Sequence, residues 1–157
     1  MSQRLNAAQV APDAFKALMG VEMYVRLSGL EQPLIELVRL RASYMNGCAY
    51  CVDMHTKDAR AAGETEQRLF GVPVWRETSY FTERERAALE WAEAVTSLSQ
   101  GAVSDSVYEN VRGQFNEREL VDLTMAVIAI NAWNRAAIAF RTEPGSYQRP
   151  VEIQSGA

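Results

Sequence analysis

Hydrophobic residues recur every three or four positions along most of the chain, the spacing that lines one face of an α-helix. No stretch shows the strict alternation of apolar and polar residues that is typical of half-buried β-strands. The pattern therefore predicts an all-α protein. The predicted helices span residues 12 to about 27, 34 to about 45, 48 to 61 or 62, 83 to about 99, 104 to about 113 and 116 to about 140.

Residues at the ends of these stretches support the boundaries. Pro12 suits the first position of a helix, because its missing N–H has no partner there anyway. Thr82 followed by Glu85 is the pattern of a capping box, in which two side chains satisfy free N–H groups at a helix start. Asn116 followed by Glu119 marks the start of the longest helix.

Two regions lack a helical period. Residues 63–80 are irregular, and Gly71-Val72-Pro73 within them is expected to be a loop. The tail at 144–157 contains Gly, Ser, Gln and Pro, and we expect it to be extended or disordered. We therefore expect a single domain over residues 1–157 with about six to seven helices and a core from about residue 33 to 141.

Length, charge and composition narrow the functional classes. The 157 residues suffice for one domain with a real core, and 48% hydrophobic with 23% charged residues is typical of a globular protein. The net charge is −4 and the basic residues are scattered, so the sequence does not indicate a nucleic-acid partner. The N-terminus lacks the apolar run of a signal peptide, and the apolar stretch 123–130 is too short to cross a bilayer. We expect a cytoplasmic protein without a membrane partner.

The last predicted helix is apolar on most of its circumference between Leu123 and Ala139. Such a helix needs cover on several sides, and in a small domain part of it can come from another subunit. We therefore expect a homo-oligomer. Asn131, Asn134 and Arg135 interrupt the apolar surface. They either form hydrogen bonds between packed helices or at an interface, or place one residue, with Asn131 as the candidate substrate contact, beside an active site.

Both cysteines and the only histidine fall within eight consecutive residues, in the order Cys48-x-x-Cys51-x-x-x-His55. On a helix, Cys51 and His55 would lie on one face, roughly 6 Å apart. Cys48 would lie at the helix N-terminus, where free N–H groups and the macrodipole favour a thiolate. In a reducing compartment two cysteines so close in sequence are not expected to form a merely structural bridge. The arrangement predicts a pair of thiols that cycles between dithiol and disulfide.

Glu36 can be placed relative to this cluster. Asn46-Gly47 breaks the second helix, and an antiparallel hairpin about this break brings Glu36 and His55 to within ~3 Å of the same height. The residues around Glu36 are apolar, so its carboxylate needs a partner, which the imidazole or a water would supply. Glu36 is then the expected acceptor of a proton relayed from Cys51 through His55.

Other interpretations of the cluster remain open. A structural zinc site would use Cys48, Cys51 and His55 with Glu36 or Asp53, although structural zinc usually takes four Cys or His ligands. A haem attachment motif needs histidine directly after the second cysteine, and a thioredoxin-like motif needs strands. Tyr50, between the cysteines, is either a packing residue or a substrate contact.

The set Glu36-(eleven residues)-Cys48-x-x-Cys51-x-x-x-His55 closely resembles the core of the AhpD-like alkylhydroperoxidases, of the carboxymuconolactone decarboxylase superfamily. The resemblance covers roughly residues 33–141, and Asn131-x-x-Asn134-Arg135 resembles the final helix of small single-domain members. It implies an all-α fold that assembles into trimers or hexamers built from dimers. It also implies hydroperoxide reduction without haem, metal or flavin.

Carried over to this chain, the resemblance makes Cys51 the peroxidatic thiol, Cys48 the resolving thiol, and Glu36 with His55 the proton relay. It also implies an external reductant, which is a small thiol, a lipoyl group or a thioredoxin-like protein. Tyr50 stands where the best-studied type has a further histidine, so one proton-shuttling group is missing. Two alternatives remain: a lyase of the decarboxylase type, and a redox-sensing or structural oligomer.

Overall fold

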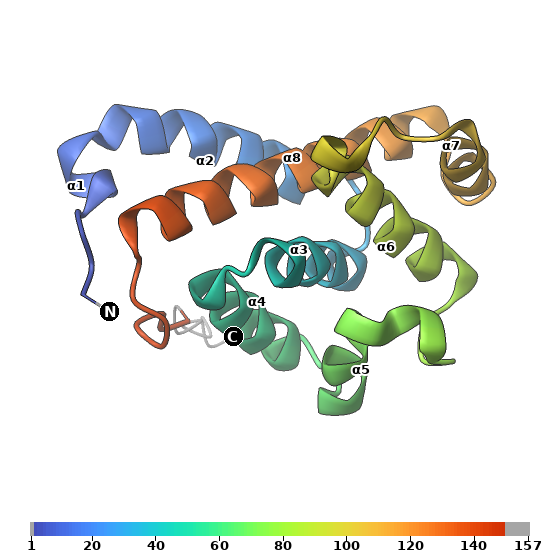
Figure 1. Ribbon diagram of the computed structural model, residues 1–157, viewed down its shortest axis with the longest axis horizontal. Helices are drawn as coiled ribbons and strands as arrows, with labels where there is room; N and C mark the ends of the chain where they lie inside the picture. The colour runs from blue at the N-terminus through green and yellow to red at the C-terminus, as the bar shows by residue number, and fades with distance from the viewer. Residues whose placement is uncertain (1, 150–157) are drawn as a thin grey trace, which may run out of the picture.

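The computed structural model describes residues 2–149, and within this range it contains helices and connecting segments but no strands (Figure 1). The helices are α1 (Ala7–Val10), α2 (Pro12–Arg26), α3 (Gln32–Asn46), α4 (Ala49–Ala61), α5 (Glu66–Gly71), η1 (Val72–Glu77), α6 (Glu83–Thr96), η2 (Leu98–Gln100), α7 (Asp105–Arg112) and α8 (Glu117–Phe140), where η marks a 3-10 helix. The all-α prediction is confirmed. Helices α1 and α5 are additional to the six stretches that the periodicity located.

Helix α3 is the centre of the fold. It packs against α4, α6 and α8, while α2 lies along α8 (Figure 1). Both sides of α3 are buried. Leu37 and Leu40 belong to a cluster with Trp75, and Ile35 and Val38 belong to a second cluster under α6, α7 and α8. From residue 34 to residue 43 every position except Arg41 is buried, which makes this part of α3 a rigid support for a site.

The α3–α4 connection is the tight break that the sequence predicts. Gly47 ends α3 in the left-handed conformation, with φ 69°, and its N–H donates to Tyr44 O. The N–H of Cys48 donates to Ser43 O at 3.0 Å, which closes the turn. Because the connection is so short, α4 packs back along α3.

The predicted caps are present at both later helix starts. Thr82 and Glu85 form a reciprocal capping box at the start of α6. Asn116 and Glu119 form another at the start of α8. These bonds satisfy N–H groups that would otherwise lack a partner within the helix.

The expectation of an irregular segment at 63–80, with a loop at Gly71-Val72-Pro73, is wrong. Gly71 is the last residue of α5, and Val72 and Pro73 begin η1. The Thr65 side chain accepts from Arg68 N and caps α5. Helices this short do not display a full hydrophobic period, so their buried side chains are recognisable only in the tertiary structure. A Cβ on Gly71 would lie 2.9 Å from the Tyr80 ring, so a larger residue at this position would require the ring to shift.

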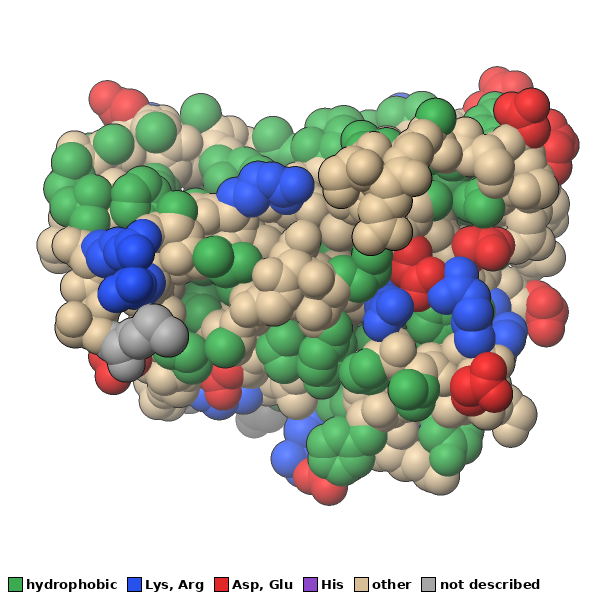
Figure 2. Space-filling model, in the orientation of Figure 1, with side chains coloured by type: hydrophobic (Ala, Val, Ile, Leu, Met, Phe, Trp, Pro, Cys, Tyr) green, Lys and Arg blue, Asp and Glu red, His purple; other side chains and the backbone are tan. Residues whose placement is uncertain are grey.

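Helix α8 is long and apolar enough to cross a membrane by length and composition alone, which the stretch 123–130 had not suggested. Its most apolar window has mean hydropathy 1.3, and 33% of that window is buried. The core helix of a soluble protein passes the same test. Here α8 packs against α2, α3 and α6, but Val121, Ile128 and Ile138 remain exposed. Hydrophobic side chains gather along the edge over α2 and α8 (Figure 2).

Residues 143–147, called the C-terminal strap below, follow α8 and contain no helix. The strap is held against α4. Gly145 N donates to Asp53 Oδ2 at 3.2 Å, Lys57 Nζ donates to Tyr147 O at 3.1 Å, and Tyr147 Oη donates to Asp58 Oδ1 at 2.8 Å. The described part of the expected tail is therefore non-helical and docked. Residues 150–157 lie outside the described range.

Candidate active site

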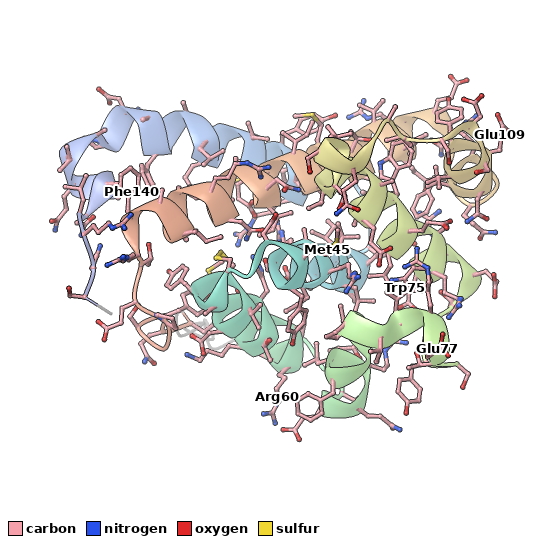
Figure 3. The ribbon with its side chains drawn as sticks, viewed as in Figure 1. Met45, Arg60, Trp75, Glu77, Glu109 and Phe140 are labelled. Carbon is pink, nitrogen blue, oxygen red and sulfur yellow. A yellow bond between two sulfur atoms is a disulfide. The ribbon has the colours of Figure 1, made fainter. Side chains whose placement is uncertain are left out.

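The two cysteines lie at the start of α4 and are joined by a disulfide, with Cα atoms 5.3 Å apart (Figure 3). Cys48 is the N-cap residue of the helix, and the backbone N–H of Cys51 donates to Cys48 Sγ at 3.3 Å. The sequence predicted this position for Cys48. The Cys48 sulfur therefore lies at the end of the helix where the free N–H groups favour negative charge.

The two sulfurs have different surroundings. Each cysteine is 1% exposed. Cys51 lines a pocket together with His55, which lies one helical turn further along α4. Both cysteines pack in one cluster with Ala42 and Ile130. Of the two, Cys51 is the one that lines the pocket, because the lining does not include Cys48.

Glu36 and His55 are paired across the α3–α4 hairpin. Glu36 Oε2 lies 2.9 Å from His55 Nδ1. The exposed fractions of the two residues are 4% and 6%, so both groups are removed from bulk water. The structure therefore brings together the carboxylate and the imidazole that the sequence placed at similar heights.

The second oxygen of Glu36 is occupied by groups that sequence reasoning missed. Gln32 Nε2 donates to Glu36 Oε1 at 2.9 Å, and Arg39 Nη1 donates to the same oxygen at 2.6 Å. Arg39 Nη2 also donates to Glu22 Oε1, on α2. The three-residue spacing of Glu36 and Arg39 on an apolar helix was a signal for their pairing. No local pattern pointed to Glu22, which is distant in sequence.

The charge of Glu36 follows from these contacts. Burial by itself would raise the pKa of this carboxyl, but the hydrogen bond and charge of His55, together with Arg39, hold the pKa below its ordinary value. An ionised carboxylate only accepts hydrogen bonds, so His55 Nδ1 carries the hydrogen of this bond. His55 Nε2 is buried, and no group within residues 2–149 forms a hydrogen bond with it. In the neutral imidazole Nε2 is therefore a free proton acceptor.

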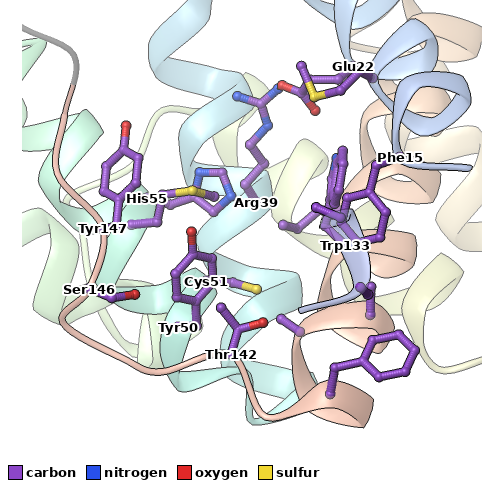
Figure 4. Close-up of a pocket in the computed structure, with 18 of the residues that line it drawn as sticks. Phe15, Glu22, Arg39, Tyr50, Cys51, His55, Trp133, Thr142, Ser146 and Tyr147 are labelled. Atoms are coloured by element: carbon purple, nitrogen blue, oxygen red, sulfur yellow. The ribbon is translucent and has the colours of Figure 1, made fainter. Parts of the chain in front are cut away.

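The pocket beside Cys51 and His55 has a volume of about 520 Å³ (Figure 4). Its walls are mainly apolar and come from distant parts of the chain. The Phe15 and Trp133 rings, from α2 and α8, lie 5.6 Å apart between centroids. The other large apolar or aromatic side chains of the lining are Leu5, Met19, Tyr50, Met54, Ile130, Phe140 and Tyr147. A pocket of this size accommodates an organic molecule.

Two tyrosines lie on the α4 side of the pocket. Tyr50 is half-buried in its lining, which is the location that a substrate contact requires. Tyr147 from the strap lies beside it (Figure 4). Burial and the hydrogen bond to Asp58 raise the pKa of Tyr147 to about 12, so its hydroxyl stays protonated at neutral pH.

These observations were compared with known proteins. Residues 12–94 match the model of the carboxymuconolactone decarboxylase family. The chain belongs to this family. An uncharacterized protein, YdfG, of Bacillus subtilis (strain 168) is 41% identical over 146 residues, covering 93% of this chain and 99% of that protein. A second uncharacterized relative, YnjA of Escherichia coli (strain K12), is 30% identical over 100 residues, covering 64% of this chain and 54% of its own length.

Solved structures of other proteins have the same fold. A protein of unknown function from Agrobacterium tumefaciens, named as a candidate AhpD antioxidant defence protein, is 47% identical with TM-score 0.88, covering 96% of this chain and 100% of that chain. The debrominase Bmp8 has TM-score 0.79 over 88% of this chain and 74% of its own. Its 18% identity shows a shared fold alone.

In this family member Asn131 lies away from the pocket. Asn131 Nδ2 donates to Thr96 Oγ1 at 2.9 Å, and Asn46 Nδ2 donates to Asn131 Oδ1 at 3.0 Å. The fully buried Asn134 accepts from Asn46 at 2.8 Å and donates to Ser43 Oγ at 3.0 Å. These bonds link α3, α6 and α8. The geometry therefore supports the helix-packing interpretation of the asparagines and gives no support to Asn131 as a substrate contact.

Asp53, the alternative fourth ligand of a zinc site, is held elsewhere. Its Oδ2 accepts from Lys57 Nζ at 2.8 Å and from Gly145 N at 3.2 Å, on the strap side of α4. Among residues 2–149 no three or more Cys, His, Asp or Glu side chains gather in a metal-binding arrangement.

Proposed function

We propose that the protein is a thiol-dependent hydroperoxide reductase whose reactive thiol is Cys51. The observation that carries this proposal is that His55 lines the same pocket as Cys51, with its Nδ1 fixed by ionised Glu36 and its buried Nε2 without a hydrogen-bond partner among residues 2–149. A thiol beside a proton acceptor of fixed tautomer is an activated nucleophile. The disulfide shows that the second sulfur, Cys48, is within bonding distance.

The reaction begins with the reduced pair. The Cys51 thiol transfers its proton to His55 Nε2, and the negative charge of Glu36 stabilises the imidazolium. The thiolate attacks the terminal oxygen of a hydroperoxide, ROOH. The O–O bond breaks, the leaving alkoxide takes the proton from His55, and the products are ROH and a sulfenic acid at Cys51.

Cys48 completes the oxidative half. Its thiolate attacks the Cys51 sulfur and expels the sulfenic oxygen, which leaves as water after protonation. The helix N-terminus and the Cys51 N–H favour the thiolate form of Cys48 before this step. Two thiol groups from an external reductant return the disulfide to the dithiol and are themselves oxidised to a disulfide. A small thiol, a lipoyl group or a thioredoxin-like protein would supply them.

The lining of the pocket favours an organic hydroperoxide over hydrogen peroxide. Phe15, Trp133 and Phe140 offer apolar surface for a hydrocarbon group. Arg39, the buried cation of the lining, is already paired with Glu22 and Glu36. The site therefore suits an uncharged substrate with a sizeable apolar group.

A thiol count tests the proposal. Fully reduced protein has two thiols per chain, and one equivalent of cumene hydroperoxide should remove both rapidly, with recovery by dithiothreitol. Formation of one equivalent of cumyl alcohol should accompany the loss. Survival of both thiols would overturn the proposal.

Two other functions make different predictions for the same protein. A lyase of the decarboxylase type does not depend on the cysteine pair, so it would retain lactone turnover after replacement of both cysteines by serine. A redox-sensing or structural oligomer would form the disulfide without sustained peroxide turnover when reductant is supplied.

We further propose that one domain spans the chain, that it works in the cytoplasm, and that it forms trimers or hexamers built from dimers. The exposed apolar residues of α8 support an assembly, since contact with another copy would bury them. Light scattering coupled to size exclusion tests the assembly, and a monomer at micromolar concentration would contradict it.

A further inference from the structure

The buried charges extend beyond the pair of Glu36 and His55. Arg39 is 3% exposed and bridges two carboxylates, Glu36 on its own helix and Glu22 on α2. Figure 4 shows its side chain reaching from α3 toward Glu22 at the edge of the pocket. An arginine so deeply buried is found only where its charge is compensated, and here the guanidinium fork serves both carboxylates at once.

This bridge determines which oxygen of Glu36 reaches the imidazole. Arg39 and Gln32 both donate to Oε1, so Oε2 alone is left for His55 Nδ1. A carboxylate held at one oxygen by a rigid guanidinium cannot rotate freely about its last torsion. The orientation of the imidazole therefore depends on a residue that does not touch it.

We propose that Arg39, held in turn by Glu22, is a positioning residue for His55: it clamps Glu36 so that the imidazole keeps its hydrogen on Nδ1 and leaves Nε2 free to accept the Cys51 proton. The proposal rests on the proposed function only in the identity of the thiol that His55 serves. It gives α2, whose Phe15 lines the pocket, a part in positioning the imidazole.

The charges that face Glu36 come from three helices. Arg39 contributes from α3 and His55 from α4. Glu22 faces the cluster from α2 through Arg39, and Glu22 Oε1 also lies 3.8 Å from the exposed Arg26 guanidinium. Glu22 partly offsets the charge of Arg39. Its removal should make the surroundings of Cys51 more positive, whereas removal of Arg39 should make them more negative.

A purely structural role predicts something different. An arginine that only neutralises buried carboxylates would change the free energy of unfolding, without changing the tautomer of His55 or the reactivity of Cys51. The chain offers a matched control in Arg41, two residues further on α3. Arg41 Nε donates to Glu93 Oε1 at 2.7 Å, and Arg41 is 17% exposed and outside the pocket lining.

The first measurement uses the fact that His55 is the only histidine. In ¹⁵N-labelled, tag-free reduced protein, two-bond ¹H–¹⁵N spectra report which imidazole nitrogen carries the hydrogen. We expect the Nδ1–H tautomer in the unsubstituted protein and in Arg41→Met. Arg39→Met should give a mixture of both tautomers.

The second measurement is the rate of Cys51 alkylation by iodoacetamide in a Cys48→Ser background, as a function of pH. Arg39→Met should slow alkylation at neutral pH by about tenfold, a part of the 10²–10⁴-fold that a positioned base contributes. The midpoint of its pH curve should move upward. Glu22→Gln keeps an oxygen that accepts from Arg39 Nη2 but removes a negative charge, so it should move the midpoint downward. Arg39→Lys should recover part of the rate because it keeps one ion pair, and its midpoint should move upward by less than in Arg39→Met.

Neither measurement uses a hydroperoxide, so the positioning role and the proposed peroxidase activity can fail separately. Unchanged tautomer and alkylation profile in Arg39→Met, together with a lower free energy of unfolding, would overturn the positioning role. If Arg39→Met does not fold, the pH curves of Cys51 alkylation in Arg39→Lys and Glu22→Gln test the positioning role instead. An identical direction of shift in Glu22→Gln and Arg39→Lys would then contradict the proposal.

Discussion

Glu36 Oε2 lies 2.9 Å from His55 Nδ1, although the two residues are 19 positions apart in the sequence. The pair joins the middle of the most enclosed helix, α3, to the helix that carries both cysteines. It fixes the imidazole that lines the same pocket as Cys51, and the consequences of the proposed proton relay can be measured.

Replacing each cysteine should affect hydroperoxide reduction in a different way. Cys51→Ser should abolish hydroperoxide reduction, because the nucleophile beside His55 is lost. Cys48→Ser should still reduce one equivalent and then stop, with Cys51 left as a sulfenic acid that dimedone traps. Mass spectrometry of intact protein detects both outcomes. Equal residual turnover in the two variants would refute this division of roles.

Glu36→Gln should slow the attack on hydroperoxide and move its pH dependence upward. The neutral amide no longer stabilises the imidazolium that forms when Cys51 loses its proton. Stopped-flow kinetics with cumene hydroperoxide under single-turnover conditions measures the step directly. An unchanged pH–rate profile would count against the relay.

Glu36 should also make stability depend on pH. Its folded-state pKa lies below the ordinary value of 4.5, so it contributes stability above that pH and loses it as pH falls through the folded pKa. The free energy of urea unfolding of the oxidised protein, relative to Glu36→Gln, should therefore be larger at pH 7 than below pH 4.5. A difference that is constant across this range would show that the charge of Glu36 is not the cause.

Filling the pocket should discriminate between substrates. Ala136 lines the pocket, and Ala136→Phe should raise KM for cumene hydroperoxide by about tenfold, equivalent to about 1.4 kcal/mol, while hydrogen peroxide is little affected. The control is Ala139→Phe, an exposed position outside the lining on the same helix. Equal effects on both peroxides would argue that the pocket does not hold the organic group.

Asn134 should prove structural. Asn134→Ala removes the partner of Asn46 and Ser43 in a fully buried network, which should lower the free energy of unfolding by about 1–3 kcal/mol. The peroxide kinetics of the folded fraction should stay unchanged. Denaturant titration and single-turnover kinetics on the same preparation provide both values. A loss of activity without a loss of stability would instead indicate that the asparagines contribute to the active site.

The sequence alone determined what local forces control. Helix spans followed from hydrophobic spacing, and the starts of α6 and α8 followed from capping residues, because these signals lie within a few residues of the structure they specify. The contact of Glu36 with His55 could also be predicted, because a short break at Gly47 constrains the two adjoining helices to pack antiparallel.

Only the tertiary structure decided the rest. Helices α5 and η1 are stabilised by burial of a few side chains, and they are too short to show a hydrophobic period in the sequence. Glu22 reaches Arg39 because α2 and α3 both pack against α8, and the pocket is closed by residues from both ends of the chain, such as Phe15 and Tyr147. Such contacts arise from the packing of whole helices. A single residue type at one position therefore does not predict them. The sequence left both a helix contact, which it favoured, and a substrate contact open for Asn131.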